Sequence, residues 1–218
     1  MAIFLALVHY PCLNRRGQVV ATALTNVDIH DLARSGRTFG AEAVYLVTPV
    51  TLQQRMAEEV VAHWTQGEGS EHLRRAEAMR RVVVTASIED ACADITRRTG
   101  RAPQVAVTGA QMREPTHSFA QLRQRLHADA VADASATPDA SATPEPSAGL
   151  EASSAAVPVL LLFGTGWGMA PQVIDAAAIR LPPIRREPAL PAGAGPYNHL
   201  SVRAAVAIAL DRLLGEQG

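Results

Sequence analysis

Short apolar runs alternate with amphipathic segments along most of the chain. The runs are rich in Val, Leu and Ile and predict buried strands; they lie at Ile3–His9, Ala43–Pro49, Val82–Thr85, Gln104–Ala110 and Pro158–Phe163. The segments between them have apolar residues at helical spacing, and they lie at Asp28–Phe39, Thr51–Trp64, Ile88–Thr99 and from Ser118 to about Leu126. Because strands and helices alternate, we expect an α/β fold with a mostly parallel sheet flanked by helices.

Three further segments extend this pattern. The β-branched stretch Val19–Thr25 is typical of a second strand near the N-terminus. Pro171–Ile179 is amphipathic, and a final helix with an alanine-rich face begins after Ser201, a residue type that favours the N-cap position. These elements complete a single domain over residues 1–218.

One stretch, at about 128–156, has a different composition. The hexamer DASATP occurs at Asp133–Pro138 and again at Asp139–Pro144, and large apolar residues are almost absent. Such a tract cannot offset the entropy lost on ordering, so it predicts a disordered insert. An interdomain linker is the less favoured alternative, because the piece that follows is too small to bury its own core.

Composition and charge exclude several classes of protein. A net charge of -1 excludes a strongly basic protein that coats polynucleotides, although all the positive side chains are arginines and leave a local arginine surface open. The two cysteines, Cys12 and Cys92, exclude a disulfide framework and a four-cysteine zinc site. The N-terminal apolar run is too short to cross a bilayer. We therefore expect a soluble, reduced, cytoplasmic protein without a membrane or metal partner.

The sequence GTGWG follows the last apolar strand and precedes an amphipathic segment. Its glycines, Gly164, Gly166 and Gly168, either let a ligand approach the backbone or make a tight turn, and the turn is favoured for a lone motif. Met169 stands at the third glycine of the GxGxxG fingerprint, and no GxxxxGK[ST] sequence occurs. A nucleotide- or NAD-binding module therefore stays an alternative.

The C-terminal third resembles the SPOUT superfamily of RNA methyltransferases. The similar segments are LLLFGTGWGMA (Leu160–Ala170), the apolar run that ends at Ile184, and YNHLSVRAAVAIALDRLL (Tyr197–Leu214). The resemblance implies a C-terminal trefoil knot, three loops that wrap S-adenosylmethionine, and a last helix that also forms a homodimer interface. The cofactor-binding residues it implies are Thr108, Gly109, Phe163, Gly164, Thr165, Gly168, Ile184, Asn198, His199, Leu200 and Ser201.

The early segment NVDIHDLARSGRTFG (Asn26–Gly40) is similar to the loop and helix of that superfamily in which an arginine assists catalysis. The resemblance therefore makes Arg34 a catalytic residue. Asp28 stands where many members have asparagine, and it is either a catalytic group beside Arg34 or the N-cap of the following helix. His30 and Asp31, which lie close to Asp28 in the sequence, are further candidates for the general base that removes a proton from the acceptor.

Three other polar or aromatic residues near these segments have two interpretations each. Trp167 either stacks on a base or a methionine tail, or packs under its loop, which is the commoner use of tryptophan. Arg203 either faces RNA phosphate or pairs with an acid. For His199, a hydrogen bond that orders its loop is favoured over acid–base chemistry.

The order of all these segments looks most like a bacterial branch related to the tRNA guanine-N1 methyltransferases. That resemblance implies S-adenosylmethionine-dependent methylation of structured RNA, with tRNA as the substrate, guanine N1 as the acceptor, and a homodimer as the assembly. The alternatives are the nucleotide-binding module and a non-catalytic RNA-binding protein that keeps the fold. Binding of S-adenosylmethionine distinguishes a methyltransferase from the nucleotide-binding module. Methylation of total RNA distinguishes it from the non-catalytic RNA-binding protein.

Overall fold

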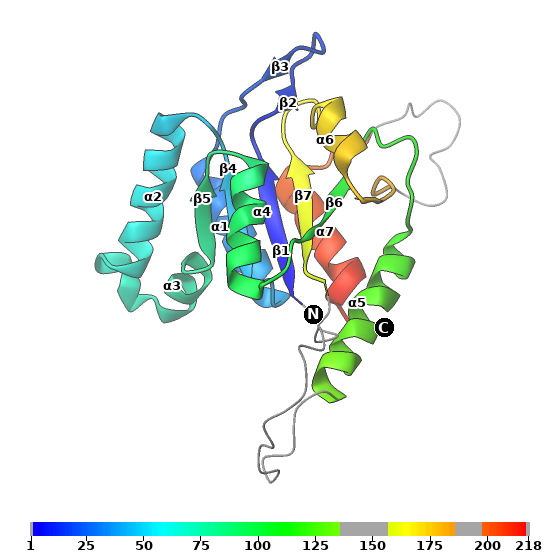
Figure 1. The fold of residues 1–218 in the computed structure, drawn as a ribbon. Helices are drawn as coiled ribbons and strands as arrows, with labels where there is room; N and C mark the ends of the chain where they lie inside the picture. The colour runs from blue at the N-terminus through cyan, green and yellow to red at the C-terminus, as the bar shows by residue number, and fades with distance from the viewer. Residues whose placement is uncertain (1, 136–156, 186–197, 217–218) are drawn as a thin grey trace.

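A six-stranded parallel sheet forms the centre of the molecule (Figure 1). The computed structural model describes residues 2–135, 157–185 and 198–216. In spatial order the strands are β5 (Val82–Thr85), β4 (Ala43–Val47), β1 (Ile3–Val8), β7 (Val159–Gly164), β6 (Gln104–Thr108) and β8 (Ile179–Arg180). All five neighbouring pairs are parallel, as the alternation of strands and helices predicts.

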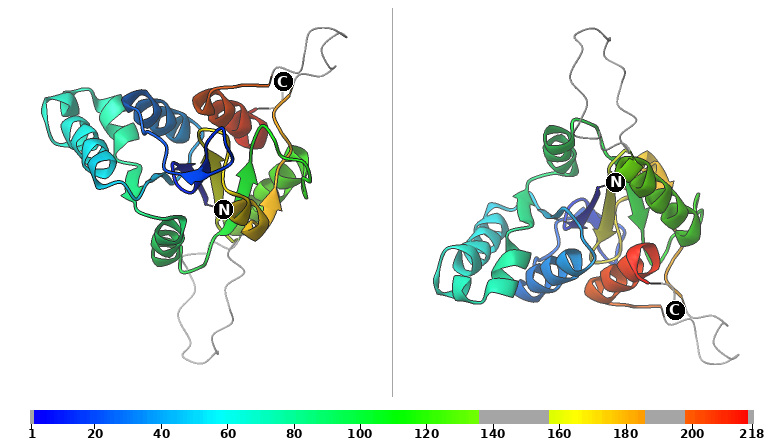
Figure 2. Two further views of the ribbon diagram at one scale, coloured as in Figure 1. Left: turned by 90° about the horizontal axis from the view of Figure 1, so that it is seen from above. Right: turned by 90° about the horizontal axis from the view of Figure 1, so that it is seen from below.

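Helices cover both faces of this sheet (Figure 2). Alternate residues of β1 point to opposite faces, so Leu5 and Leu7 belong to one apolar cluster while Phe4 and Ala6 belong to the other. The first cluster is completed by α1 (Asn26–Thr38), α2 (Thr51–Thr65), α3 (Leu73–Met79), α5 (Phe119–Ser135) and α7 (Val202–Leu214). The second is completed by α4 (Ile88–Thr99) and α6 (Pro171–Ala176).

The helix starts follow local capping chemistry. Ser201 caps α7, as the sequence predicts, and Ser87 caps α4 in a capping box with Asp90. The N-cap of α1 is Thr25, whose hydroxyl accepts a hydrogen bond from the Asp28 amide, so the interpretation of Asp28 as the N-cap is wrong. The helix starts two residues earlier than its apolar pattern predicts, because the Thr25 hydroxyl satisfies an amide of the first turn.

Several predicted boundaries differ from the structure. Of the expected strand Val19–Thr25, Val19–Val20 alone is strand; this β3 pairs antiparallel with β2 (Cys12–Leu13) in a separate ribbon. Helix α5 continues to Ser135, into the segment predicted to be disordered, because the alanines there have the highest helix propensity. The rest of the predicted insert lies outside the described residues. The short η1 (Glu68–Glu71) and α3 were not predicted.

The predicted knot depends on how the chain passes from β8 to α7. Residues 186–197 lie outside the described residues, so the threading stays a prediction. Among the residues that the structure does describe, no helix is long and apolar enough to cross a membrane.

Candidate functional site

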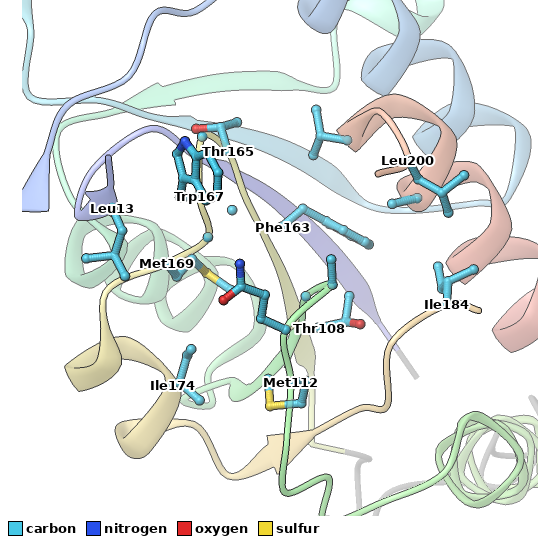
Figure 3. Close-up of a pocket in the computed structure, with 18 of the residues that line it drawn as sticks. Leu13, Thr108, Met112, Phe163, Thr165, Trp167, Met169, Ile174, Ile184 and Leu200 are labelled. Atoms are coloured by element: carbon cyan, nitrogen blue, oxygen red, sulfur yellow. The ribbon is translucent and has the colours of Figure 1, made fainter. Parts of the chain in front are cut away.

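An open pocket lies at the carboxyl edge of the central strands (Figure 3). From β1 the chain passes to β4 and β5 on one side of the sheet, and then to β6, β7 and β8 on the other. Ligands of open parallel sheets bind where the strand order reverses in this way, outside the carboxyl ends of the strands. The pocket has a volume of about 1170 Å³, which is large enough for a nucleoside-sized ligand.

Segments that are far apart in the sequence meet in this pocket. Ten of the eleven predicted cofactor-binding residues line it, and these are Thr108, Gly109, Phe163, Gly164, Thr165, Gly168, Ile184, Asn198, His199 and Leu200. The eleventh, Ser201, is not part of the lining; its hydroxyl instead accepts a hydrogen bond of 3.2 Å from the Ala204 amide and caps α7. The segment Gln111–Glu114 and the side chains of Thr22 and Ile174 also line the pocket, and the sequence did not single them out.

The glycines of the segment Gly164–Gly168, called the glycine loop below, are required by the loop itself. A Cβ atom on Gly164 would lie 2.6 Å from Met169 Cγ and 2.9 Å from the Met169 amide nitrogen. Gly166 and Gly168 have φ angles of 61° and 105°, which L side chains rarely adopt. The tight-turn interpretation therefore accounts for all three glycines, and the turn forms one wall of the pocket.

The glycine loop is fastened to the N-terminal ribbon by backbone hydrogen bonds. The Trp167 amide donates to the Leu13 carbonyl at 3.0 Å, and the Leu13 amide donates to the Gly168 carbonyl at 2.8 Å. The Ala170 amide donates to the Pro11 carbonyl at 3.0 Å. Residues from the two ends of the chain thus fix the same wall of the pocket, a long-range pairing that no local sequence signal reveals.

Behind the loop, a buried histidine and two threonine hydroxyls form a polar network. The Thr165 hydroxyl donates to the Val8 carbonyl at 3.0 Å and is hydrogen-bonded to the Thr22 hydroxyl. Thr22 Oγ1 lies 3.0 Å from His9 Nδ1. His9 is fully buried, and burial lowers its pKa from 6.5 to about 4 while the Asp28 charge opposes that shift. His9 is therefore neutral at physiological pH.

The low pKa of His9 predicts a specific loss of stability in acid. Between pH 6.5 and about pH 4 the unfolded chain protonates His9 while the folded chain does not, so the free energy of unfolding falls as the pH falls through this window. The contribution of His9 amounts to about 3 kcal/mol at most. Urea unfolding at a series of pH values should give a flatter acid limb for His9→Asn than for the wild type. Parallel curves for the two proteins would contradict this account.

Asp28 lines the pocket, and both of its carboxylate oxygens are engaged. Oδ1 accepts from Arg203 Nη1 at 3.0 Å and Oδ2 accepts from the Thr25 hydroxyl at 2.5 Å. Arg203 also pairs with Asp31 at 3.2 Å, so this arginine joins α1 to α7. Of the two interpretations of Arg203, pairing with an acid is confirmed. Asp28 would have to release a partner before it accepted a proton from a substrate.

Two other predicted residues lie where the sequence did not place them. Arg34 is exposed on α1 and is not part of the pocket lining, so the structure does not bring it together with Asp28 at the pocket. Trp167 lines the pocket but is 49% exposed, so the expectation that it packs under its loop is wrong.

The lining combines apolar surface with charges of both signs. Phe163, Met112, Ile174 and Ile184 supply apolar surface. The carboxylates that line the pocket are Asp28, Glu114 and Asp175, and the guanidinium groups are Arg113 and Arg180. In the part of the chain that the structure describes, no group of three His, Cys, Asp or Glu side chains is placed to hold a metal ion. The arrangement suits a ligand that has a flat apolar part and both a positive and a negative charge.

A parallel α/β fold with a pocket at its switch point defines a ligand-binding class that includes many transferases. Within that class the chain belongs to the family described as SAM-dependent RNA methyltransferase, which it matches over residues 2–134 and 130–215. This membership confirms the resemblance to RNA methyltransferases that the C-terminal segments indicated.

Individual relatives agree with the family. The protein named "tRNA (guanine-N(1)-)-methyltransferase" in Nitratidesulfovibrio vulgaris is 39% identical over 218 residues, which cover 98% of this chain and 42% of that protein. Its counterpart of the same name in Oleidesulfovibrio alaskensis is 37% identical, again over 42% of its length. The chain thus spans about two fifths of these curated relatives. A protein of Aquifex aeolicus named "Uncharacterized protein" is 30% identical over 97% of this chain and 87% of its own length.

Solved structures share the fold at low sequence identity. A probable methyltransferase from Bordetella pertussis has a TM-score of 0.54 and 15% identity, and the match covers 97% of this chain and 93% of that one. The SpoU methyltransferase AviRb from Streptomyces viridochromogenes has a TM-score of 0.52 and 11% identity, over 98% of this chain and 58% of that one. At such identities these two structures support the fold and not the substrate.

Proposed function

We propose that this chain binds S-adenosylmethionine in the pocket and transfers its methyl group to RNA. The observation that carries the proposal is the convergence of the glycine loop, the segment ending at Ile184, the segment before α7 and the end of β6 in one pocket. These are the segments for which the SPOUT resemblance implies cofactor binding. The family to which the chain belongs supports the same activity.

The residues present suit the cofactor. Phe163, Met112 and Ile184 offer apolar surface for an adenosine, and the backbone groups of the glycine loop lie beside them. Carboxylates in the lining favour a positively charged sulfonium, and Arg113 and Arg180 favour the carboxylate of its methionine part. The cofactor supplies an activated methyl group for in-line displacement, so the protein mainly orients the two reactants and handles one proton.

We further propose tRNA as the substrate and guanine N1 as the acceptor. The SPOUT resemblance supports both, and two curated relatives carry that name. More than half of each named relative lies outside the match, and the name describes the whole protein.

Arg34 and Asp28 are proposed as the catalytic side chains, in a homodimer that acts in the cytoplasm on its RNA. The exposure of Arg34 supports a role between subunits, because it lies outside the pocket of its own protomer. Ala204, Ala205 and Ala207 on α7 are partly exposed and permit a partner helix to pack closely, whereas Ala209 packs inside its own protomer. We also propose that residues 1–218 form a single domain interrupted by the insert at about 128–156, and that its C-terminal part forms a trefoil knot.

The two alternatives are less well supported. The strand that follows the glycine loop, β8, pairs with β6 rather than with β7 and has two residues, unlike a full dinucleotide-binding unit. A non-catalytic RNA-binding protein would keep the pocket but lose turnover.

A methylation assay on total RNA tests the proposed activity. With methyl-labelled S-adenosylmethionine, the purified protein should label tRNA in RNA from cells that lack its gene, and nucleoside mass spectrometry should identify the product. Methylguanine with the methyl group on N1 would confirm the proposed acceptor. A different methylated nucleoside would contradict guanine N1 as the acceptor atom. Absence of label in the RNA, despite binding of the cofactor, would favour the non-catalytic alternative.

A further inference from the structure

Exposed aromatic surface gathers at the N-terminal ribbon and the glycine loop. Trp167 is 49% exposed and Tyr10 is 41% exposed, and no other aromatic side chain in the described residues is as exposed as these two. Trp167 lines the pocket, and its backbone is held by the hydrogen bond to Leu13. An indole left half in water forgoes hydrophobic stabilisation that burial would bring. The glycine loop therefore presents this ring to solvent at the pocket.

Two unpaired arginines flank this aromatic surface. Arg15 and Arg16 occupy the tight turn between β2 and β3, and both are exposed. The turn is closed by the Asn14 side chain, which accepts hydrogen bonds from the amides of Arg16 and Gln18 at 2.8 and 3.0 Å. Neither guanidinium has a carboxylate partner among the described residues. The turn thus holds two unneutralised positive charges in a defined place.

The arginine turn and Trp167 are close in space. Leu13 is hydrogen-bonded to Trp167 and to Gly168, and Figure 3 shows Leu13 and Trp167 on the same side of the pocket. The two arginines follow Leu13 by two and three residues, which at 3.8 Å per residue places their backbones within about 11 Å of it. This distance is comparable with the length of one or two nucleotides in an extended single strand.

We propose that Trp167, Arg15 and Arg16 form the surface on which single-stranded RNA enters the pocket, with a base stacked on the indole and its phosphates at the two guanidinium groups. An aromatic face beside unpaired positive charges is the combination that binds single strands without reading a duplex. Exposed loop bases of a structured RNA have this form. This inference rests on the proposed function, because it assigns the substrate side of the same pocket.

The test measures binding of a fluorescein-labelled single-stranded RNA of about a dozen nucleotides by anisotropy. Trp167→Leu keeps apolar volume but removes the stacking face, and should weaken binding about tenfold. The double variant Arg15→Ala, Arg16→Ala should weaken binding and reduce the slope of log K against log salt by about 1.4, which corresponds to two single-strand phosphates. Arg55→Ala with Arg74→Ala is the matched control, since these exposed arginines lie on α2 and α3.

Calorimetry with S-adenosylhomocysteine on the same variants separates the RNA from the cofactor. Affinity for this ligand should stay within about twofold of the wild type in the arginine variant, because neither Arg15 nor Arg16 lines the pocket. Loss of this affinity in the arginine variant, or an equal loss of RNA binding in the Arg55 and Arg74 control, would overturn the inference. A wild type that binds the cofactor product but not the RNA would also overturn it and leave the cofactor site standing. Failure of the wild type to bind S-adenosylhomocysteine would instead contradict the proposed function.

Discussion

Replacing Gly164 with valine is expected to lower the affinity for S-adenosylhomocysteine by up to about a hundredfold, because forcing extra atoms into a packed site costs about 1–3 kcal/mol. The added Cβ would lie 2.9 Å from the Met169 amide nitrogen, and a backbone atom cannot move aside as a flexible side chain does. The loop would have to shift, and its hydrogen bonds to Leu13 and Pro11 would shift with it. Calorimetry on the purified variant measures the effect.

Gly109 provides a matched control for Gly164. It lines the same pocket, but a Cβ on Gly109 would meet nothing within 4 Å and its φ lies outside the left-handed region. Gly109→Val should therefore fold as the wild type does, which makes it the control for the stability of Gly164→Val. Thermal unfolding of both variants shows whether any affinity lost in Gly164→Val reflects a lost fold. Wild-type affinity in a folded Gly164→Val variant would contradict the assignment of the glycine loop as a cofactor wall.

Replacing Arg34 with alanine is expected to lower the rate of methyl transfer by at least about a hundredfold while cofactor affinity stays nearly unchanged. Removal of a group that stabilises charge or transfers a proton in the transition state typically slows a reaction by this factor. Affinity is expected to persist because Arg34 is exposed and lies outside the pocket lining. Single-turnover rates and calorimetry measure the two quantities separately. An unchanged rate in Arg34→Ala would remove Arg34 from the catalytic proposal.

A mixing experiment tests whether Arg34 acts on the pocket of another subunit. In a mixed dimer of Arg34→Ala and Gly164→Val, one pocket is intact and the partner carries the intact arginine. Activity should return on mixing if Arg34 serves the neighbouring pocket. If the mixture stays as inactive as the separate variants, although mixed dimers form, Arg34 does not act across the interface.

The sequence predicts the layered fold well because local signals decide it. Apolar runs of β-branched and leucine residues can be buried only as central strands, and β1, β4, β5, β6 and β7 all lie where these runs are. The capping box at Ser87 and Asp90 marks the start of α4 from four residues alone. Short elements are not predicted, because a local pattern needs several residues. The helix α3 and the two-residue strands have too few residues for a periodic pattern.

The site is predicted less completely because its contacts are long-range. The glycine loop was recognisable by its composition, yet what fixes it is the ribbon at Pro11–Leu13, more than a hundred residues earlier. The pairing of Arg203 with Asp28 and the burial of His9 depend in the same way on helices and strands meeting in space. His9 falls at the end of the predicted buried strand Ile3–His9, but no local signal shows that its ring contacts Thr22 or that Asp28 pairs with Arg203.

The most direct test of the central claim is a calorimetric titration of the wild-type protein with S-adenosylhomocysteine. The account predicts saturable binding with one site per chain, abolished or strongly weakened in Gly164→Val. Absence of binding to the wild type at about millimolar ligand, a limit that corresponds to roughly 4 kcal/mol of binding free energy, would contradict it.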